Sequence, residues 1–214
     1  MAIARRKGHG APDSPVMTTE DPGPLDPENR RRLLAAVDAC DANSSVYDQV
    51  FAEIGQRIRE ADEAGKLDLA ALIMWKRSGQ GSWVKDLLTT PEQEVRAITR
   101  DAFAIMGDLP VLRTLATLPG FTSQGPIATA LMAARNPYDW GILDVRATNA
   151  LACLGRPIGE KRGKTLRYLT EVRRLRDDLA KERRGITARE IDKGLWWLDK
   201  FNPETPRGRR RGRG

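Results

Sequence analysis

The chain has 214 residues, 40% of them hydrophobic and 30% charged, which is enough for one domain with a core of its own. No apolar run approaches the roughly 18 residues that span a membrane, and Gly and Pro stand where a signal peptide needs an apolar stretch. These features exclude a membrane protein and predict a cytoplasmic one.

The net charge of +7 is concentrated at the end of the chain. The segment from Arg207 to Gly214 carries five arginines and no acid, so the remainder has a net charge of 7 − 5 = +2. Cys40 and Cys153 lack a second cysteine or a histidine at metal-ligand spacing, and the single histidine is His9. We therefore expect no metal and no cofactor, and any catalysis must use carboxylates, lysines or backbone dipoles.

Composition divides the chain into three parts. Residues 1–28 are rich in Gly, Pro, Asp and Ser and are expected to be a disordered N-terminal tail. Residues 29–202 are expected to form one all-helical domain. Residues 203–214 form an Arg/Gly-rich tail, which serves either as an auxiliary contact to phosphate backbones or simply as a solubilising segment.

Apolar residues recur at helical spacing through most of the central part. Helices are predicted over 29–40 and 45–64, with Ser45 as a cap, and from Asp68 to Trp75, where Gly79 and Gly81 interrupt the pattern. Thr90-Pro-Glu starts the next helix, which ends at Gly107, and Pro110 starts another. Further helices are predicted over 165–182 and after the capping box Thr187-Ala-Arg-Glu190. The fold class is therefore all-α.

The segment from Leu118 to Asp144 contains the most informative pattern. An apolar helix ends at Leu118-Pro119-Gly120, a loop holds Gly120 and Gly125, and a second helix follows from Pro126. Glycines let the backbone turn tightly and let a phosphate approach, and the N-terminus of the second helix attracts that phosphate. This helix–loop–helix pattern predicts a clamp on the backbone of one DNA strand.

Asp144 opens the helix that follows the loop 135–141, and two interpretations remain open for it. An aspartate at this position is an ordinary N-cap. Alternatively, the helix dipole keeps a carboxylate ionised beside the DNA clamp, where it can stabilise a sugar cation or activate water.

The motifs LPGF, ATALMAA and NPYDWGILDVRATNALACLG, in this order, resemble the helix-hairpin-helix DNA glycosylase superfamily, which includes endonuclease III. The resemblance is closer to an uncharacterised branch with Trp-Lys (Trp75-Lys76), Leu-Asp-x-Arg-Ala (from Leu143 to Ala147) and Asp-Lys-x-Leu-Trp (from Asp192 to Trp196) motifs. It covers roughly residues 65 to 202. It implies a bundle of two helical lobes, with a hairpin at Leu118, Pro119 and Gly120 and with Asp144 at the position of the catalytic aspartate.

Two features of the chain depart from the pattern of the superfamily. Thr122 replaces the second glycine of the hairpin, and no lysine occurs between Lys85 and Lys161, whereas bifunctional members use a hairpin lysine as the nucleophile. The resemblance therefore implies a monofunctional base-excision DNA N-glycosylase, in which Asp144 and a water molecule act. Otherwise Lys76 would serve as the nucleophile from another helix; its alternatives are a solvent-exposed residue or a phosphate contact.

A glycosylase also needs a pocket for an extruded base. Trp75 and Trp140 are candidates for that pocket, with packed core aromatics as the alternative, and Phe121 is either a core residue or a wedge at the hairpin tip. The other expected DNA contacts are Thr122, Gly125, Arg146, Lys161, Arg162 and Lys164.

DNA is the expected partner, and the protein is expected to associate with the nucleoid. Two alternatives to the enzyme remain open, since fold does not fix function. One is a non-catalytic DNA-binding or damage-sensing protein, and the other is a protein-interaction module that retains only the fold.

Overall fold

The structure is a computed structural model that describes residues 23–43, 45–77, 79, 81–122, 125–159 and 162–201. These residues form ten α-helices and no strand, which confirms the all-α prediction. None of the described helices is both long enough and apolar enough to cross a membrane. Lys161 and the Arg/Gly-rich tail lie outside the described residues.

The helices follow one another with short connections. They are α1 (Pro27–Ala42), α2 (Val46–Ala61), α3 (Lys66–Lys76), α4 (Gly81–Thr89), α5 (Glu92–Ala104), α6 (Asp108–Leu115), α7 (Pro126–Arg135), α8 (Val145–Cys153), α9 (Lys164–Leu179) and α10 (Ala188–Phe201).

Several helices begin at side chains that satisfy the free backbone N–H groups of a first turn. The Asp26 carboxylate accepts a hydrogen bond from the backbone N–H of Asn29 at the start of α1. In the predicted capping box before α10, Glu190 accepts from the backbone N–H of Thr187, and the Thr187 hydroxyl accepts from the N–H of Glu190. These starts follow directly from the local sequence.

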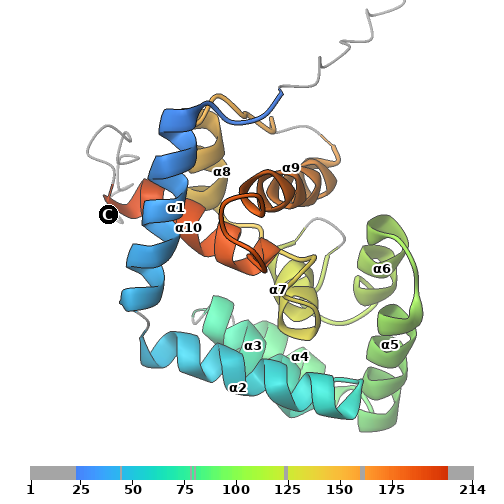
Figure 1. Ribbon diagram of the computed structural model, residues 1–214. Helices are drawn as coiled ribbons and strands as arrows, with labels where there is room; N and C mark the ends of the chain where they lie inside the picture. The colour runs from blue at the N-terminus through green and yellow to red at the C-terminus, as the bar shows by residue number, and fades with distance from the viewer. Residues whose placement is uncertain are drawn as a thin grey trace, which may run out of the picture.

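The helices form two groups around one continuous core (Figure 1). In the first group, α10 packs against α1, α8 and α9. The second group consists of α2, α3, α4, α5 and α6, and α7 packs against α2 and α3 of this group. Helix α7 is the most completely buried helix of the fold, since every residue from Ile127 to Ala134 is buried. It lies between the two groups in Figure 1.

The structure corrects three sequence-based boundaries. Residues from Gly81 to Thr89 form α4, although Gly79 and Gly81 were expected to interrupt helical structure here. The helix expected to start at Pro110 begins at Asp108. The folded part begins within the expected N-terminal tail, because Leu25 is buried and its backbone N–H donates to Asp178 on α9. In each case packing against distant residues stabilises a segment whose local composition favours a loop.

Helix α10 lies so close to α1 that their contact requires a glycine. A Cβ atom built on Gly194 would come within 2.5 Å of Cγ2 of Val37 and 3.2 Å of Cδ1 of Leu33. The branched side chain of Val37 has little rotational freedom to yield. The absence of a side chain at Gly194 therefore sets the separation of the two helices.

We predict that Gly194→Ala destabilises the protein by about 1–3 kcal/mol, because overpacking outweighs the gain of about 1 kcal/mol in helix propensity. Urea unfolding at pH 7 measures the effect. Gly81→Ala is the control, because a Cβ there meets nothing within 4 Å. A Gly194→Ala protein as stable as wild type would contradict the close packing of α1 and α10.

Candidate active site

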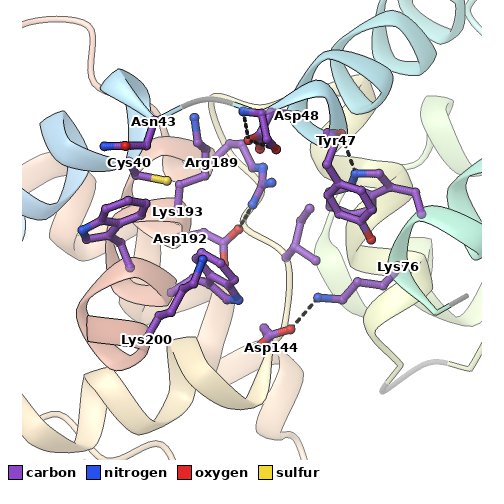
Figure 2. A pocket seen from close by; sticks show the side chains of 15 residues that line it. Cys40, Asn43, Tyr47, Asp48, Lys76, Asp144, Arg189, Asp192, Lys193 and Lys200 are labelled. Carbon is purple, nitrogen blue, oxygen red and sulfur yellow. Dashed lines mark hydrogen bonds and ion pairs between the residues drawn. The ribbon is translucent and has the colours of Figure 1, made fainter. Parts of the chain in front are cut away.

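A cavity of about 330 Å³ opens between the two groups of helices, a size typical of a small-ligand site. Its walls come from the end of α1, the start of α2, the end of α3, the segment before α8 and one face of α10 (Figure 2). We call it the α3–α10 pocket. Its residues are Cys40, Asn43, Ser45, Tyr47, Asp48, Trp75, Lys76, Ile142, Asp144, Arg189, Asp192, Lys193, Trp196, Trp197 and Lys200.

Asp144 combines both roles that its sequence position allowed. One carboxylate oxygen, Oδ1, accepts the backbone N–H of Arg146 at 2.9 Å and so caps α8. The other oxygen, Oδ2, accepts a hydrogen bond from Nζ of Lys76 at 2.7 Å. The cap therefore fixes the carboxylate while its second oxygen faces the pocket.

Lys76 is the last residue of α3 and lies 68 positions before its partner in the sequence. The side chains of Lys76 and Asp144 retain 13% and 24% of their exposure, so the ion pair is largely shielded from bulk water. Figure 2 shows Lys76 reaching toward Asp144 across the lower part of the pocket. The structure thus brings together the two residues proposed from sequence as alternative catalytic groups.

The ionisation of Asp144 depends on this pair. Burial raises the pKa of the carboxyl group, but the positive charge and hydrogen bond of Lys76, together with the N–H of Arg146, lower it more. The pKa of Asp144 therefore lies below its ordinary value of 3.8, and the group is a carboxylate at neutral pH.

Trp75 forms the aromatic wall of the pocket beside Lys76. Its indole N–H donates to the backbone carbonyl of Tyr47 at 2.9 Å, and its ring packs against Tyr47 at 5.1 Å and Phe51 at 4.5 Å between centroids. Trp75 is buried, whereas Tyr47 is 53% exposed and stacked on it. A fixed indole thus supports an exposed aromatic ring at the mouth of the pocket, which can stack on a planar ligand.

Helix α10 contributes pocket residues that sequence reasoning did not single out. The side chains of Arg189, Lys193, Trp197 and Lys200 recur at spacings of three to four residues along one face of the helix, and all of them line the pocket. Ile191 and Leu195 of the same helix are buried in the core, whereas Trp196 lines the pocket. These cationic and aromatic residues recur at helical spacing in the sequence, and this pattern could have predicted a binding face on the helix.

The predicted hairpin lies outside the lining of this pocket. Leu118 and Phe121 are buried in the core, so their side chains are not available to DNA, and the wedge alternative for Phe121 is wrong. Pro119 is half-buried and Thr122 is exposed. Gly125 immediately precedes α7, and its backbone N–H donates to the carbonyl of Thr122 at 3.0 Å.

Gly120 is required by the fold itself. Its φ of +79° favours glycine, and a Cβ there would come within 2.8 Å of Cβ of Trp83 on α4. Trp83 therefore packs directly on the turn, and Arg77 lies over the same indole at 5.9 Å. The glycine serves this packing contact, whether or not a phosphate also approaches the turn.

The remaining predicted residues are spread over other surfaces. Trp140 is buried beneath Arg173, whose guanidinium lies 5.4 Å from the ring, and it lines a separate groove rather than the α3–α10 pocket. The side chain of Arg146 is 47% exposed and pairs with Asp199 at 3.1 Å. Arg162 is exposed and Lys164 half-buried at the start of α9.

No protein-family model matches this chain, and neither a curated protein nor a solved structure matches it. The protein is therefore described by the features of its own structure. It is an all-helical protein with a shielded lysine–aspartate pair and an aromatic wall in one pocket.

We predict that Lys76→Gln raises the pKa of Asp144. Burial raises this pKa, and the substitution removes the positive charge of Lys76, which is the largest of the influences that lower it. Carbon-detected NMR titration of the Asp144 carboxyl group measures this change. Lys85→Gln, at an exposed position of α4, is the control and leaves that pKa in place.

The sign of the pH effect on stability follows from the lowered pKa. The carboxylate of Asp144 stabilises the fold at pH values above 3.8, and this contribution is lost as the pH falls through its lowered pKa.

In the NMR titration, an Asp144 pKa that is the same in wild type and Lys76→Gln would contradict the ion pair.

Proposed function

We propose that this protein is a base-excising DNA N-glycosylase whose catalytic centre is the pair Lys76–Asp144. The observation that carries the proposal is the 2.7 Å contact between the two side chains inside a pocket with an aromatic wall. A lysine and a carboxylate within 2.6–3.2 Å are the arrangement expected of a nucleophile and the base that activates it.

The chemistry of the pair suits cleavage of a glycosidic bond. Lys76 must lose a proton before its nitrogen can attack, and the carboxylate of Asp144 is the adjacent acceptor. The neutral amine then bonds to C1′ of the sugar while the bond from C1′ to the base breaks. The bonding electron pair leaves with the base, which takes up the proton held by Asp144 and so restores the carboxylate. Opening of the sugar ring gives an iminium ion on Lys76, with the proton from nitrogen transferred to the ring oxygen.

Asp144 supports the same reaction through its charge. The transition state of glycosidic cleavage carries positive charge on the sugar, and a carboxylate that is ionised and partly shielded from water stabilises such charge strongly. Because the N-cap hydrogen bond to Arg146 holds its first oxygen, the carboxylate needs little reorganisation during the reaction.

The rim of the pocket supports a substrate that is part of a nucleic acid. Base-modifying enzymes extrude the nucleotide from the duplex and stack the base against aromatic side chains. Tyr47 offers an exposed ring at the mouth, and Lys200 is an exposed cation among Trp196, Trp197 and Phe201, at 4.5–5.7 Å from their ring centres. A cation at the mouth can contact the phosphates that flank an extruded nucleotide.

The resemblance to helix-hairpin-helix DNA glycosylases adds to this proposal. It places the catalytic aspartate at Asp144, which is the carboxylate that meets Lys76. It also places a hairpin for the DNA backbone between α6 and α7, where the turn at Gly120 and the N-terminus of α7 lie. Lys76 takes the role of the hairpin lysine that this chain lacks.

The first test is release of bases from a panel of duplexes, each with one modified or mismatched base. We predict that Asp144→Asn lowers the release rate by at least about 10²-fold, since a positioned acid or base typically contributes that much. Asparagine also caps helices well, so the substitution removes charge while keeping the cap.

Asp26→Asn is the matched control for this measurement. Asp26 caps α1 through the same kind of hydrogen bond but pairs with no lysine of the described part of the chain and lies outside the pocket. Its variant keeps the wild-type rate. Equal rates for Asp144→Asn and wild type, or tight DNA binding with no release from any duplex, would contradict the proposed enzyme; the second result indicates a binding or damage-sensing protein.

The second test separates the two possible nucleophiles. If Lys76 bonds to C1′, borohydride reduces the iminium ion and traps a covalent protein–DNA complex with the substrate that the panel identifies. We predict trapping by wild type and by Lys85→Gln, and none by Lys76→Gln. Base release without trapping in wild type would assign the attack to water, as in the monofunctional mechanism, with Lys76 as the residue that positions Asp144.

A further inference from the structure

One wall of the α3–α10 pocket carries the guanidinium group of Arg189, which contacts on several sides hold in place. Arg189 lies over Phe51 at 5.0 Å and over Trp75 at 5.8 Å, measured from its central carbon to the ring centres. One of its terminal nitrogens, Nη1, donates a hydrogen bond to Asp192. The side chain is 15% exposed, so the group is confined between two rings and a carboxylate.

Asp192 is itself held by a second buried group. It is only 2% exposed, and its other oxygen accepts the hydroxyl of the fully buried Tyr168 at 2.6 Å. The backbone N–H of Arg189 also donates to the carbonyl of Pro137 at 3.0 Å. Tyr168 and Asp192 are therefore positioning residues for Arg189.

The remaining donors of Arg189 face the pocket. Among the described residues, Asp192 is the only hydrogen-bond partner of the guanidinium. Its Nε and Nη2 atoms are not fully buried. They are therefore accessible, and Arg189 lines the pocket (Figure 2). The pocket thus contains a fixed, planar pair of N–H donors.

The charge around this donor pair favours a neutral ligand over a phosphate. Asp192 already neutralises Arg189, and Lys193 is paired with Asp41 at 2.6 Å. Exposed Lys200, at the mouth, is better placed for a phosphate. A guanidinium that retains two parallel donors is complementary to two adjacent acceptors on the edge of a planar ring.

The position of Arg189 relative to the Lys76–Asp144 pair indicates which edge of a base would meet it. In Figure 2 the guanidinium lies on the opposite side of the pocket from Lys76 and Asp144. Since that pair would act at C1′, Arg189 would meet the edge of the base remote from the sugar. In a 6-oxopurine this edge offers O6 and N7, the acceptor pair that arginine binds most often.

We infer that Arg189 selects a 6-oxopurine, that is guanine, hypoxanthine or a derivative with free O6 and N7, as the base held in the α3–α10 pocket. The inference rests on the proposed function for the placement of the sugar at Lys76 and Asp144. Adenine is disfavoured because its 6-amino group is a hydrogen-bond donor and would face the N–H donors of Arg189. Cytosine has adjacent acceptors, but one of them lies next to the bond to the sugar.

The test is equilibrium binding of five deoxynucleosides to the full chain, measured by calorimetry. Deoxyguanosine and deoxyinosine are expected to bind about tenfold or more tightly than deoxyadenosine, deoxycytidine and thymidine, in line with the discrimination of one bidentate arginine contact. Arg189→Lys keeps the charge but loses the planar donor pair, and it is expected to remove this preference.

Arg173→Lys is the matched control. Arg173 also lies over an indole, that of Trp140 at 5.4 Å, and also pairs with a carboxylate, that of Asp108, but it lies outside the pocket. Its variant is expected to retain the preference. Because Asp192→Asn would free Arg189 without removing it, a weakened preference with unchanged thermal stability would support the positioning role.

The outcomes separate this inference from the proposed function. Preferential binding of 6-oxopurines without base release from any duplex would support the specificity and contradict the enzyme. Base release confined to pyrimidines or adenine would support the enzyme and overturn the specificity of Arg189. No measurable binding of any nucleoside, or a preference that survives in Arg189→Lys, would also overturn it.

Discussion

The contact between Lys76 and Asp144 joins the end of α3 to the start of α8 and so links the two groups of helices. A shielded charge is costly unless it is paired, so the lysine at the end of α3 and the carboxylate before α8 constrain each other's position. The N-cap hydrogen bond from Arg146 fixes the carboxylate independently. The pocket, the ionised state of Asp144 and the chemistry proposed for the pair all depend on this arrangement.

Helix α10 connects this pair to the rest of the pocket. Its apolar face closes the core through Ile191 and Leu195, and Gly194 lets it approach α1 closely. The same helix presents Arg189 toward the pocket interior and Lys200 at the mouth. Ile191 and Leu195, which close the core, therefore lie on a different face of the helix from Arg189 and Lys200.

Local sequence was sufficient where short-range chemistry decides the structure. The capping box at Thr187 and the aspartate before α8 each satisfy backbone groups within one helical turn, and the proline at the start of α7 has no N–H that would need a partner. Helix α4 was missed because glycines precede it, although Trp83, Val84 and Leu87 pack on the core at helical spacing. Trp140 and Trp75 could not be told apart, because both are apolar rings near polar residues in the sequence, and only the fold directs them to different cavities.

The sequence by itself determined the helical class, most helix starts and the two candidate catalytic residues, because periodicity, caps and side-chain chemistry are local properties. Only the tertiary structure decided that Lys76 and Asp144, 68 residues apart, are 2.7 Å from each other. It also decided that Arg189 and Lys200 share their pocket while the hairpin residues do not line it. Such proximity depends on how whole helices cross, and in this chain the crossing is set by buried side chains and by glycines such as Gly194.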